Sequence, residues 1–119
     1  MRKHHELVVW QTAMELTREI YRLTNKFPSA ENFGLTSQLR RAAVSIPSNI
    51  AEGAGRGTQK EFLHFLYISR GSLCEVETQL SLASDFGYMN ISEFPSDLVE
   101  KTFSLLGGLI NSIKTKISG

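Results

Sequence analysis

The residues of this chain that could do chemistry are few, and most of them lie between positions 45 and 64. Glu61 and His64 have the Glu-x-x-His spacing of di-iron bundle proteins, but such a site needs a second copy of the motif and two further inward glutamates. Glu61 also follows Thr58 at the spacing of a capping box, which gives its carboxylate a structural role. We therefore predict no metal site and no bound cofactor.

Glycines and serines in the same region could form a phosphate loop or supply a nucleophile. Gly53, Gly55 and Gly57 follow no strand and precede no Lys-Ser/Thr pair of the P-loop type, so they favour a turn between helices. Ser45 and Ser48 have no base partner at a useful spacing. Because no catalytic constellation remains, the sequence predicts a protein that is not an enzyme.

Composition indicates one ordinary domain over residues 1–119, with 41% hydrophobic and 21% charged residues. Cys74 is the only cysteine, which fits a reducing cytoplasm and excludes a disulfide within the chain. The apolar run after the basic start is too short for a signal peptide or a membrane span. We expect a cytoplasmic protein with no membrane partner, and a frayed terminus at His4 and His5.

The elements that position these residues are predicted to be helices throughout, because apolar residues recur with a helical period and no segment alternates as a strand does. One stripe covers residues 9–27 and ends before Pro28, and the next covers residues 35–50 before a loop at 53–57. The third predicted helix begins at a Thr58 cap and stops near Gly87. The fourth begins at a Ser92 or Ser96 cap, and its stripe reaches residue 117. Short connections and seven-residue spacing predict an all-α, up-down-up-down, left-handed four-helix bundle.

Pro47 falls inside the second predicted helix. It removes one backbone donor and frees the carbonyl of Ala43, so we expect a bend there unless a side chain or water satisfies that oxygen. A polar strip runs along the same helix, and it could be a hydrogen-bonded subunit contact, a ligand site or a solvated face. Its members are Gln38, Arg41, Ser45, Asn49 and Glu52.

Two of the predicted helices carry a second apolar stripe, displaced by more than a quarter turn from the first. On the first helix it consists of Leu7, Trp10, Met14 and Tyr21; on the third it consists of Leu63, Tyr67, Gly71 and Cys74. A four-helix bundle cannot bury both sides of its own helices. We therefore predict a homo-oligomer assembled through these two helices, with Asn49 and Glu52 of the polar strip as further contacts.

The net charge of +1 hides an uneven distribution along the chain. Residues 34–74 hold five cations against two carboxylates, whereas residues 75–100 hold six carboxylates and no lysine or arginine. A folded or oligomeric form could thus present a basic face and an acidic one. The alternative is that both are ordinary solvated helix surface.

Four stretches of the sequence resemble the four-helix-bundle family of bacterial 23S rRNA intervening-sequence proteins, which are encoded within insertions in large-subunit ribosomal RNA genes and by free-standing genes. They are residues 7–14 (LVVWQTAM), 35–43 (LTSQLRRAA), 45–57 (SIPSNIAEGAGRG) and 62–72 (FLHFLYISRGS) with Glu75. This family is similar to the accessory variability protein of diversity-generating retroelements, a basic oligomeric bundle that works with a reverse transcriptase and nucleic acid. The resemblance implies a homopentamer with helices packed around a central axis.

The resemblance also implies a non-enzymatic protein associated with RNA or a nucleoprotein, in which assembly multiplies a small basic patch. The candidate phosphate contacts are Arg40, Arg41, Arg56, Lys60 and Arg70. The residues themselves leave Arg56 open to pairing with Glu52, and leave Arg40 and Arg41 open to an interface role. The alternative function is a protein-interaction scaffold, without direct nucleic-acid binding, whose partner docks on the second helix or on residues 75–100.

Overall fold

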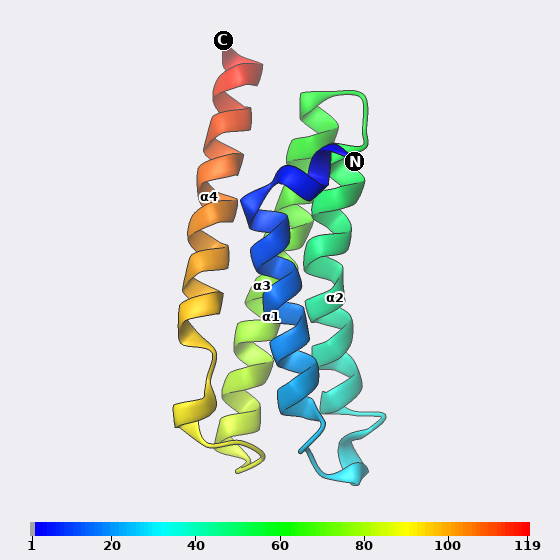
Figure 1. The fold of residues 1–119 in the computed structure, drawn as a ribbon, viewed down its shortest axis with the longest axis vertical. Helices are drawn as coiled ribbons and strands as arrows, with labels where there is room; N and C mark the ends of the chain where they lie inside the picture. The colour runs from blue at the N-terminus through cyan, green and yellow to red at the C-terminus, as the bar shows by residue number, and fades with distance from the viewer. Residues whose placement is uncertain (1) are drawn as a thin grey trace.

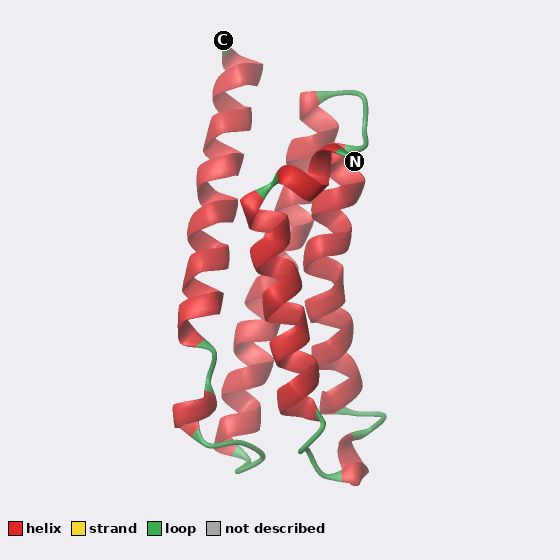
Figure 2. Ribbon diagram, viewed as in Figure 1, coloured by secondary structure: helices red, strands yellow, loops and turns green. Residues whose placement is uncertain are grey.

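The computed structural model describes residues 2–119 and contains four long α-helices (Figure 1). They are α1 (Val8–Thr24), α2 (Leu35–Ala54), α3 (Gln59–Asp85) and α4 (Ser96–Ser118). Short 3-10 helices precede α1 and interrupt two of the connections: η1 (Lys3–Glu6), η2 (Ser29–Glu31) and η3 (Ile91–Glu93). Residues 2–119 contain no strand (Figure 2), and none of their helices is long and apolar enough to cross a membrane.

The chain runs along the bundle in alternating directions, so that consecutive helices are antiparallel neighbours (Figure 1). The most extensive packing joins α2 to α3, and α4 returns to lie against α1, which leaves α1 and α3 on one diagonal. The molecule measures 49 × 22 × 22 Å. The predicted up-down-up-down four-helix bundle is thus confirmed, and its left-handed twist stays a prediction.

The core consists of the predicted apolar stripes. Every predicted member of the first and third stripes is buried; they are Val9, Ala13, Leu16, Ile20, Leu23 and Phe27, and Phe62, Leu66, Ser69, Leu73, Val76, Leu80 and Ala83. The hydroxyl of Ser69 donates to the Ile46 carbonyl of α2 at 2.9 Å. Each large aliphatic side chain removed from water contributes about 1.5–3 kcal/mol to folding before entropy is counted. The last turn of α4 is less covered than predicted, since Ile117 is 37% exposed.

Gly53 lies inside α2 and is buried, so the predicted loop at 53–57 begins too early. A Cβ at this position would lie 2.8 Å from the Cβ of Phe65 and 3.0 Å from Cδ1 of Phe62. Those distances are below ordinary van der Waals contact. The glycine therefore serves the close approach of α2 to α3 and does not end the helix.

Two other helix ends also differ from the prediction. The first helix ends at Thr24, yet Phe27 beyond it is still buried. The fourth helix has Pro95 at its N-cap and no side-chain cap, and Ser96 is its first residue, so the predicted serine cap is wrong. Proline suits this position because its missing N–H would have had no helical partner.

Both predicted ends of α3 are confirmed, although within residues 2–119 only the Thr58 half of the predicted capping box forms. The Thr58 hydroxyl accepts a hydrogen bond from the Glu61 amide at 3.1 Å, while the Glu61 carboxylate faces Arg56 at 3.6 Å. Gly87, with a φ of +78°, follows the other end. Its amide donates to the Ser84 carbonyl and the next amide donates to the Ala83 carbonyl, which is the pattern of a Schellman motif.

The hydroxyl of Thr17 on α1 is shared between the carbonyl that Pro47 leaves open and a carbonyl of its own helix. It lies 3.1 Å from the Ala43 oxygen of α2 and 2.8 Å from the Ala13 oxygen of α1. The sequence predicts that the Ala43 carbonyl needs such a donor, and the structure supplies one from another helix. Pro47 itself is buried.

The α1–α2 and α3–α4 connections lie at the same end of the bundle and are joined by polar side chains. Glu31 accepts from the Leu35 amide at 3.0 Å and from the Tyr88 hydroxyl at 2.8 Å, and Lys26 pairs with Glu93 at 2.9 Å. The two donors to Glu31, first the Leu35 amide and then the Tyr88 hydroxyl, hold the pKa of its carboxyl below the ordinary value. The same hydrogen bond raises the pKa of Tyr88.

The histidines near the N-terminus are packed, so the expectation of a frayed terminus is wrong for them. The rings of His4 and His5 each lie 5.1 Å from the ring of Trp10, and Gln11 Nε2 donates to the His5 carbonyl at 2.8 Å. These contacts hold η1 across the start of α1. They also cover part of the Trp10 ring, which is half-buried.

Candidate functional site

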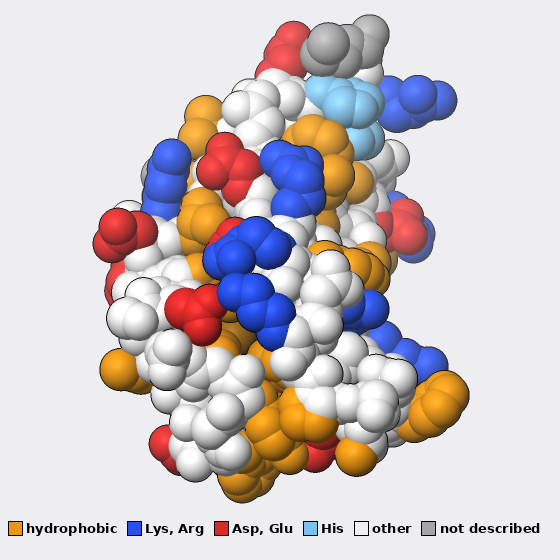
Figure 3. Space-filling model, turned by 60° about the horizontal axis from the view of Figure 1, so that its bottom comes forward, with side chains coloured by type: hydrophobic (Ala, Val, Ile, Leu, Met, Phe, Trp, Pro, Cys, Tyr) orange, Lys and Arg blue, Asp and Glu red, His pale blue; other side chains and the backbone are white. Residues whose placement is uncertain are grey.

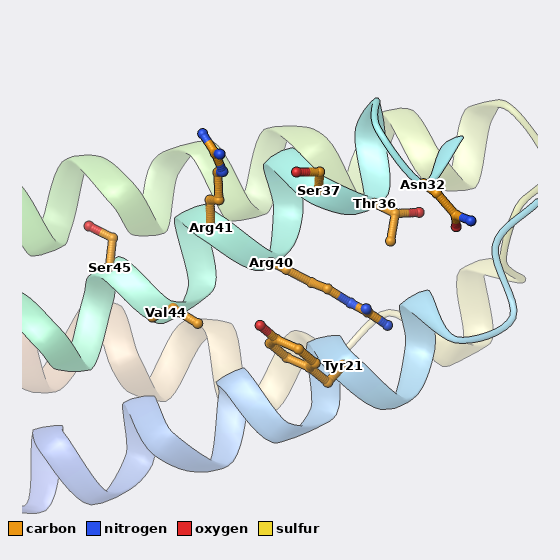
Figure 4. A pocket seen from close by; sticks show the side chains of 8 residues that line it. All are labelled: Tyr21, Asn32, Thr36, Ser37, Arg40, Arg41, Val44 and Ser45. Atoms are coloured by element: carbon orange, nitrogen blue, oxygen red, sulfur yellow. The ribbon is translucent and has the colours of Figure 1, made fainter. Parts of the chain in front are cut away.

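A groove of about 530 Å³ runs between α1 and α2, near the end of the bundle where α2 begins (Figure 4). Asn32 precedes α2, and Thr36 and Ser37 lie in its first turn. Tyr21 comes from α1, and the other lining residues follow along α2. The lining consists of Tyr21, Asn32, Thr36, Ser37, Arg40, Arg41, Val44 and Ser45. It holds two arginines and no carboxylate, which favours an anionic ligand.

Arg40 lies across the groove and binds the end of α1. Its Nε donates to the Thr24 hydroxyl at 2.8 Å, its Nη2 donates to Asn25 Oδ1 at 2.9 Å, and its guanidinium carbon lies 4.6 Å from the centre of the Tyr21 ring. All of these partners are uncharged. Arg40 therefore fastens α2 to α1 and still contributes a full positive charge to the groove.

Arg41 stands on the rim of the groove and extends away from Tyr21 (Figure 4). It is exposed and makes no ion pair or side-chain hydrogen bond within residues 2–119. On its other side it lines a shallower groove between α2 and α3, together with Gln38, Glu75 and Gln79. Its guanidinium is thus available to a ligand from either side of α2.

The other three candidate cations lie apart from this groove. Arg56 is at the opposite end of α2, where it pairs with Glu52 at 3.4 Å as anticipated, and its guanidinium carbon lies 5.0 Å from the centre of the Phe65 ring. Lys60, in the first turn of α3, is exposed and forms no ion pair in the described chain. Arg70 lies over the Tyr67 ring at 5.0 Å. The structure therefore brings Arg40 and Arg41 together and separates them from the rest.

Part of the polar strip on α2 is an internal hydrogen-bond network. Asn49 Nδ2 donates to the carbonyl of Ser45 at 2.8 Å and to its hydroxyl at 2.9 Å, and that hydroxyl lies 2.9 Å from the Ser72 hydroxyl of α3. Asn49 is half-buried, whereas Glu52 is exposed. The network links α2 to α3, so this part of the strip has a role within one chain.

The residues predicted to form the oligomer contact occupy two faces of the bundle. On α1, Trp10 and Met14 line a largely apolar groove of about 370 Å³ beside Pro47. Tyr21 instead lines the groove that holds Arg40 and Arg41, which we call the arginine groove. On α3, Tyr67 is 39% exposed, Gly71 and Cys74 are exposed, and Leu63 is half-buried against the core. Because α1 and α3 lie on one diagonal, the two apolar faces point in opposite directions.

Several residues that are exposed, or that have no hydrogen-bond partner, could not be found from the periodicity of the sequence. Phe33, in the connection before α2, has a relative exposure of 101%, and Ser37 lines the groove one turn further on. The hydroxyl of Thr36 is buried without a hydrogen-bond partner. No three His, Cys, Asp or Glu side chains gather within residues 2–119 as a metal site would require.

Hydrophobic side chains also gather at the end of the bundle that carries the α1–α2 and α3–α4 connections (Figure 3). Phe86 is 58% exposed and Ile91 is 72% exposed there, in addition to Phe33. Elsewhere on the face shown, acidic and basic side chains are interspersed. The charge asymmetry of the sequence thus becomes a patchwork on this face rather than one basic surface.

Of the comparisons with known proteins, one shows the family and another shows the fold. The family model described as "23S rRNA-intervening sequence protein" matches residues 5–111. A crystal structure at 1.70 Å of a protein of unknown function from the S23 ribosomal protein family of Bacteroides thetaiotaomicron VPI-5482 superimposes with a TM-score of 0.76 and 23% identity, covering 90% of this chain and 99% of that one. At this identity the likeness shows the fold alone. No curated protein matches the chain.

Proposed function

Since this chain belongs to the 23S rRNA-intervening sequence protein family, we propose that it is a non-enzymatic, homo-oligomeric bundle that associates with RNA, either free or within a nucleoprotein particle. The observation that carries the RNA part is the groove between α1 and α2, which is lined by Arg40 and Arg41 and by no carboxylate. Its remaining lining supplies hydroxyl and amide groups from Ser37, Asn32 and Tyr21. Such groups contact phosphates and ribose hydroxyls in protein–RNA interfaces.

Arg41 is the central phosphate contact in this proposal. Its guanidinium is not committed to another group of the described chain, and a guanidinium can hold a phosphate through two parallel hydrogen bonds. Arg40 acts beside it as a fixed charge, because the hydrogen bonds of its Nε and Nη2 to α1 hold the guanidinium in place. Lys60 adds a further exposed cation at the other end of the molecule.

The oligomer follows from the two opposite apolar faces. A two-fold dimer uses one patch of each copy, which would leave the second face in water. We call the α1 stripe with Trp10 and Met14 the Trp10 face, and the α3 stripe with Leu63, Tyr67, Gly71 and Cys74 the Tyr67 face. Contact of the Trp10 face of one copy with the Tyr67 face of the next buries both. Repetition of this contact closes a ring if the rotation from one copy to the next divides a full turn. A homopentamer, as the resemblance implies, is one such ring, with one arginine groove per copy.

The test is RNA binding measured against salt concentration. A labelled stem–loop RNA is titrated with the wild-type protein and with the variants Arg41→Gln and Lys101→Gln, and fluorescence anisotropy gives the dissociation constant. Lys101 is an exposed cation on α4, away from the groove, so its variant is a charge-matched control. We expect wild-type binding to weaken steeply with salt, and Arg41→Gln to weaken it further while lowering the salt slope by about one per contact removed.

The protein-interaction scaffold remains a second candidate, because residues 75–100 hold six carboxylates and no lysine or arginine, and Phe86 and Ile91 of this stretch are exposed. A partner with basic and apolar side chains would fit this surface. In that case the protein would bind RNA weakly at every salt concentration, and Arg41→Gln would change nothing. Equal losses from Arg41→Gln and Lys101→Gln would likewise argue against the groove as the RNA site.

A further inference from the structure

Phe33 contributes nothing to the packing of a single chain, yet the backbone around it is fixed. Its relative exposure of 101% means that its ring is as open to water as in an extended peptide. On its C-terminal side, the Gly34 amide donates to the Glu31 carbonyl at 3.0 Å and the Leu35 amide donates to the Glu31 carboxylate at 3.0 Å. Tyr88 holds the same carboxylate from the other connection. The ring is therefore presented outward from a turn tied to both connections.

Phe33 stands between polar residues of the groove that Arg40 and Arg41 line, at the end of the bundle where Phe86 and Ile91 are also exposed. Asn32 on one side of it and Thr36 on the other both line the arginine groove. The 20-residue helix α2 begins at the same place, and the Glu31 carboxylate already accepts from its first amide, that of Leu35. Thr36 is 5% exposed, and its hydroxyl has no partner, so one buried polar group here is unsatisfied.

This combination fits an unpaired nucleotide better than an apolar protein surface. A fully exposed ring offers its face to a base, and a base can stack on it only when it has left its own helix. The phosphates beside that base would then be held by Arg41, because the Glu31 carboxylate already occupies the first amide of α2. A protein partner that docked on Phe33 would meet Asn32, Ser37 and Arg41 around it, with no apolar rim in the groove lining except Val44 and Tyr21.

We propose that Phe33 stacks an unpaired RNA base while the arginine end of the groove holds the adjoining phosphates, so that this protein selects single-stranded or looped RNA over duplex. The inference rests on the proposed function and adds to it the kind of RNA that is bound. It makes Phe33 a specificity-determining residue and Arg41 a general affinity residue.

The experiment compares a single-stranded oligouridine with a blunt RNA duplex of the same length, using anisotropy at fixed salt. Stacking on one aromatic ring implies that Phe33→Ala lowers affinity for the single strand by about 5- to 150-fold and leaves duplex affinity unchanged. Phe33→Trp keeps the single-strand affinity, and its added fluorescence is quenched by the oligouridine. The matched control is Phe86→Ala, which removes another exposed phenylalanine from the same end of the bundle and should change neither affinity.

The outcomes separate the two proposals. If the wild-type protein binds RNA but Phe33→Ala matches Phe86→Ala, or lowers single-strand and duplex affinity equally, the stacking inference is overturned and the RNA proposal stands. If the wild-type protein binds neither RNA, the proposed function itself fails. Because Phe33 has no packed neighbours to lose, its alanine variant should unfold at the wild-type urea concentration, which checks that any loss of binding is local.

Discussion

The Thr17 hydroxyl of α1 lies 3.1 Å from the Ala43 carbonyl oxygen of α2. In an unbroken helix this oxygen would accept a hydrogen bond from the amide of residue 47, but residue 47 is proline and has no N–H. A buried carbonyl without a donor costs free energy comparable to a lost hydrogen bond. The same hydroxyl hydrogen is shared with the Ala13 carbonyl at 2.8 Å, so α2 gains this partner for the open carbonyl only when α1 is docked against it.

We expect Thr17→Val to lower the free energy of unfolding by about 1–3 kcal/mol, because it keeps the shape of the side chain and removes the donor. Urea unfolding followed by circular dichroism measures this. The Thr17→Ser variant keeps the hydroxyl and should cost less. In a Pro47→Ala background the amide returns, so Thr17→Val should cost less there than in the wild type; an equal cost in both backgrounds would show that the Ala43 carbonyl does not depend on Thr17.

Gly53→Ala should destabilise the protein by about 1–3 kcal/mol, although alanine is the better helix former, because the new Cβ would lie 2.8 Å from that of Phe65 on α3. The matched control is Gly108→Ala on α4, where a Cβ meets nothing within 4 Å. That change should raise stability by up to about 1 kcal/mol. Thermal unfolding that ranks the two variants in the opposite order would mean that α2 and α3 can separate without cost.

The lowered pKa of Glu31 predicts that the free energy of unfolding depends on pH. Since the folded protein holds this carboxyl below the ordinary value of 4.5, the stabilisation is present above that value and is lost as the pH falls through the folded pKa. The unfolding free energy of the wild type should therefore exceed that of Glu31→Gln near neutral pH, with the gap closing in acid. Tyr88→Phe removes one donor and should narrow the gap. A gap that stays constant from neutral pH into acid would contradict this account.

The opposite apolar faces predict that Tyr67→Glu lowers the oligomer mass in sedimentation at micromolar concentration, because a charge would enter the contact between copies. Tyr67 is 39% exposed in one chain, so the change should cost the single bundle little. Ile117→Glu is the matched control, with 37% exposure on α4. A wild-type protein that sediments only as a 13.3 kDa monomer would remove the basis for any interface.

The sequence predicts the core well because burial imposes a helical period that is visible in one chain. It identifies Ser69 as a core position and Ala43 as a carbonyl that needs a donor, and both are confirmed. It does not identify Thr17 as that donor, because the two residues lie 26 positions apart and meet only through helix packing. It places Gly53 in a loop, since glycine-rich sequence looks alike whether it bends the chain or lets two helices approach.

The candidate site is predicted less well, for a related reason. Arg40 and Arg41 are adjacent in sequence and both cationic, yet one bonds across to α1 and the other projects from the rim, and this difference depends on partners contributed by another helix. Phe33 is a single exposed residue in a connection, and a single residue has no period to detect. Functional surfaces of this kind become visible only when the connections have been placed.

In the ring proposed above, the diagonal placement of α1 and α3 has a consequence for mixtures of chains. A copy whose Tyr67 face is blocked could still receive a neighbour on its Trp10 face, so it would join a growing ring and then prevent its closure. Co-expressed in minor amounts, such a copy would act dominantly, breaking many assemblies in which most members are intact. A two-fold dimer has no such weakness, because there a blocked copy simply fails to pair.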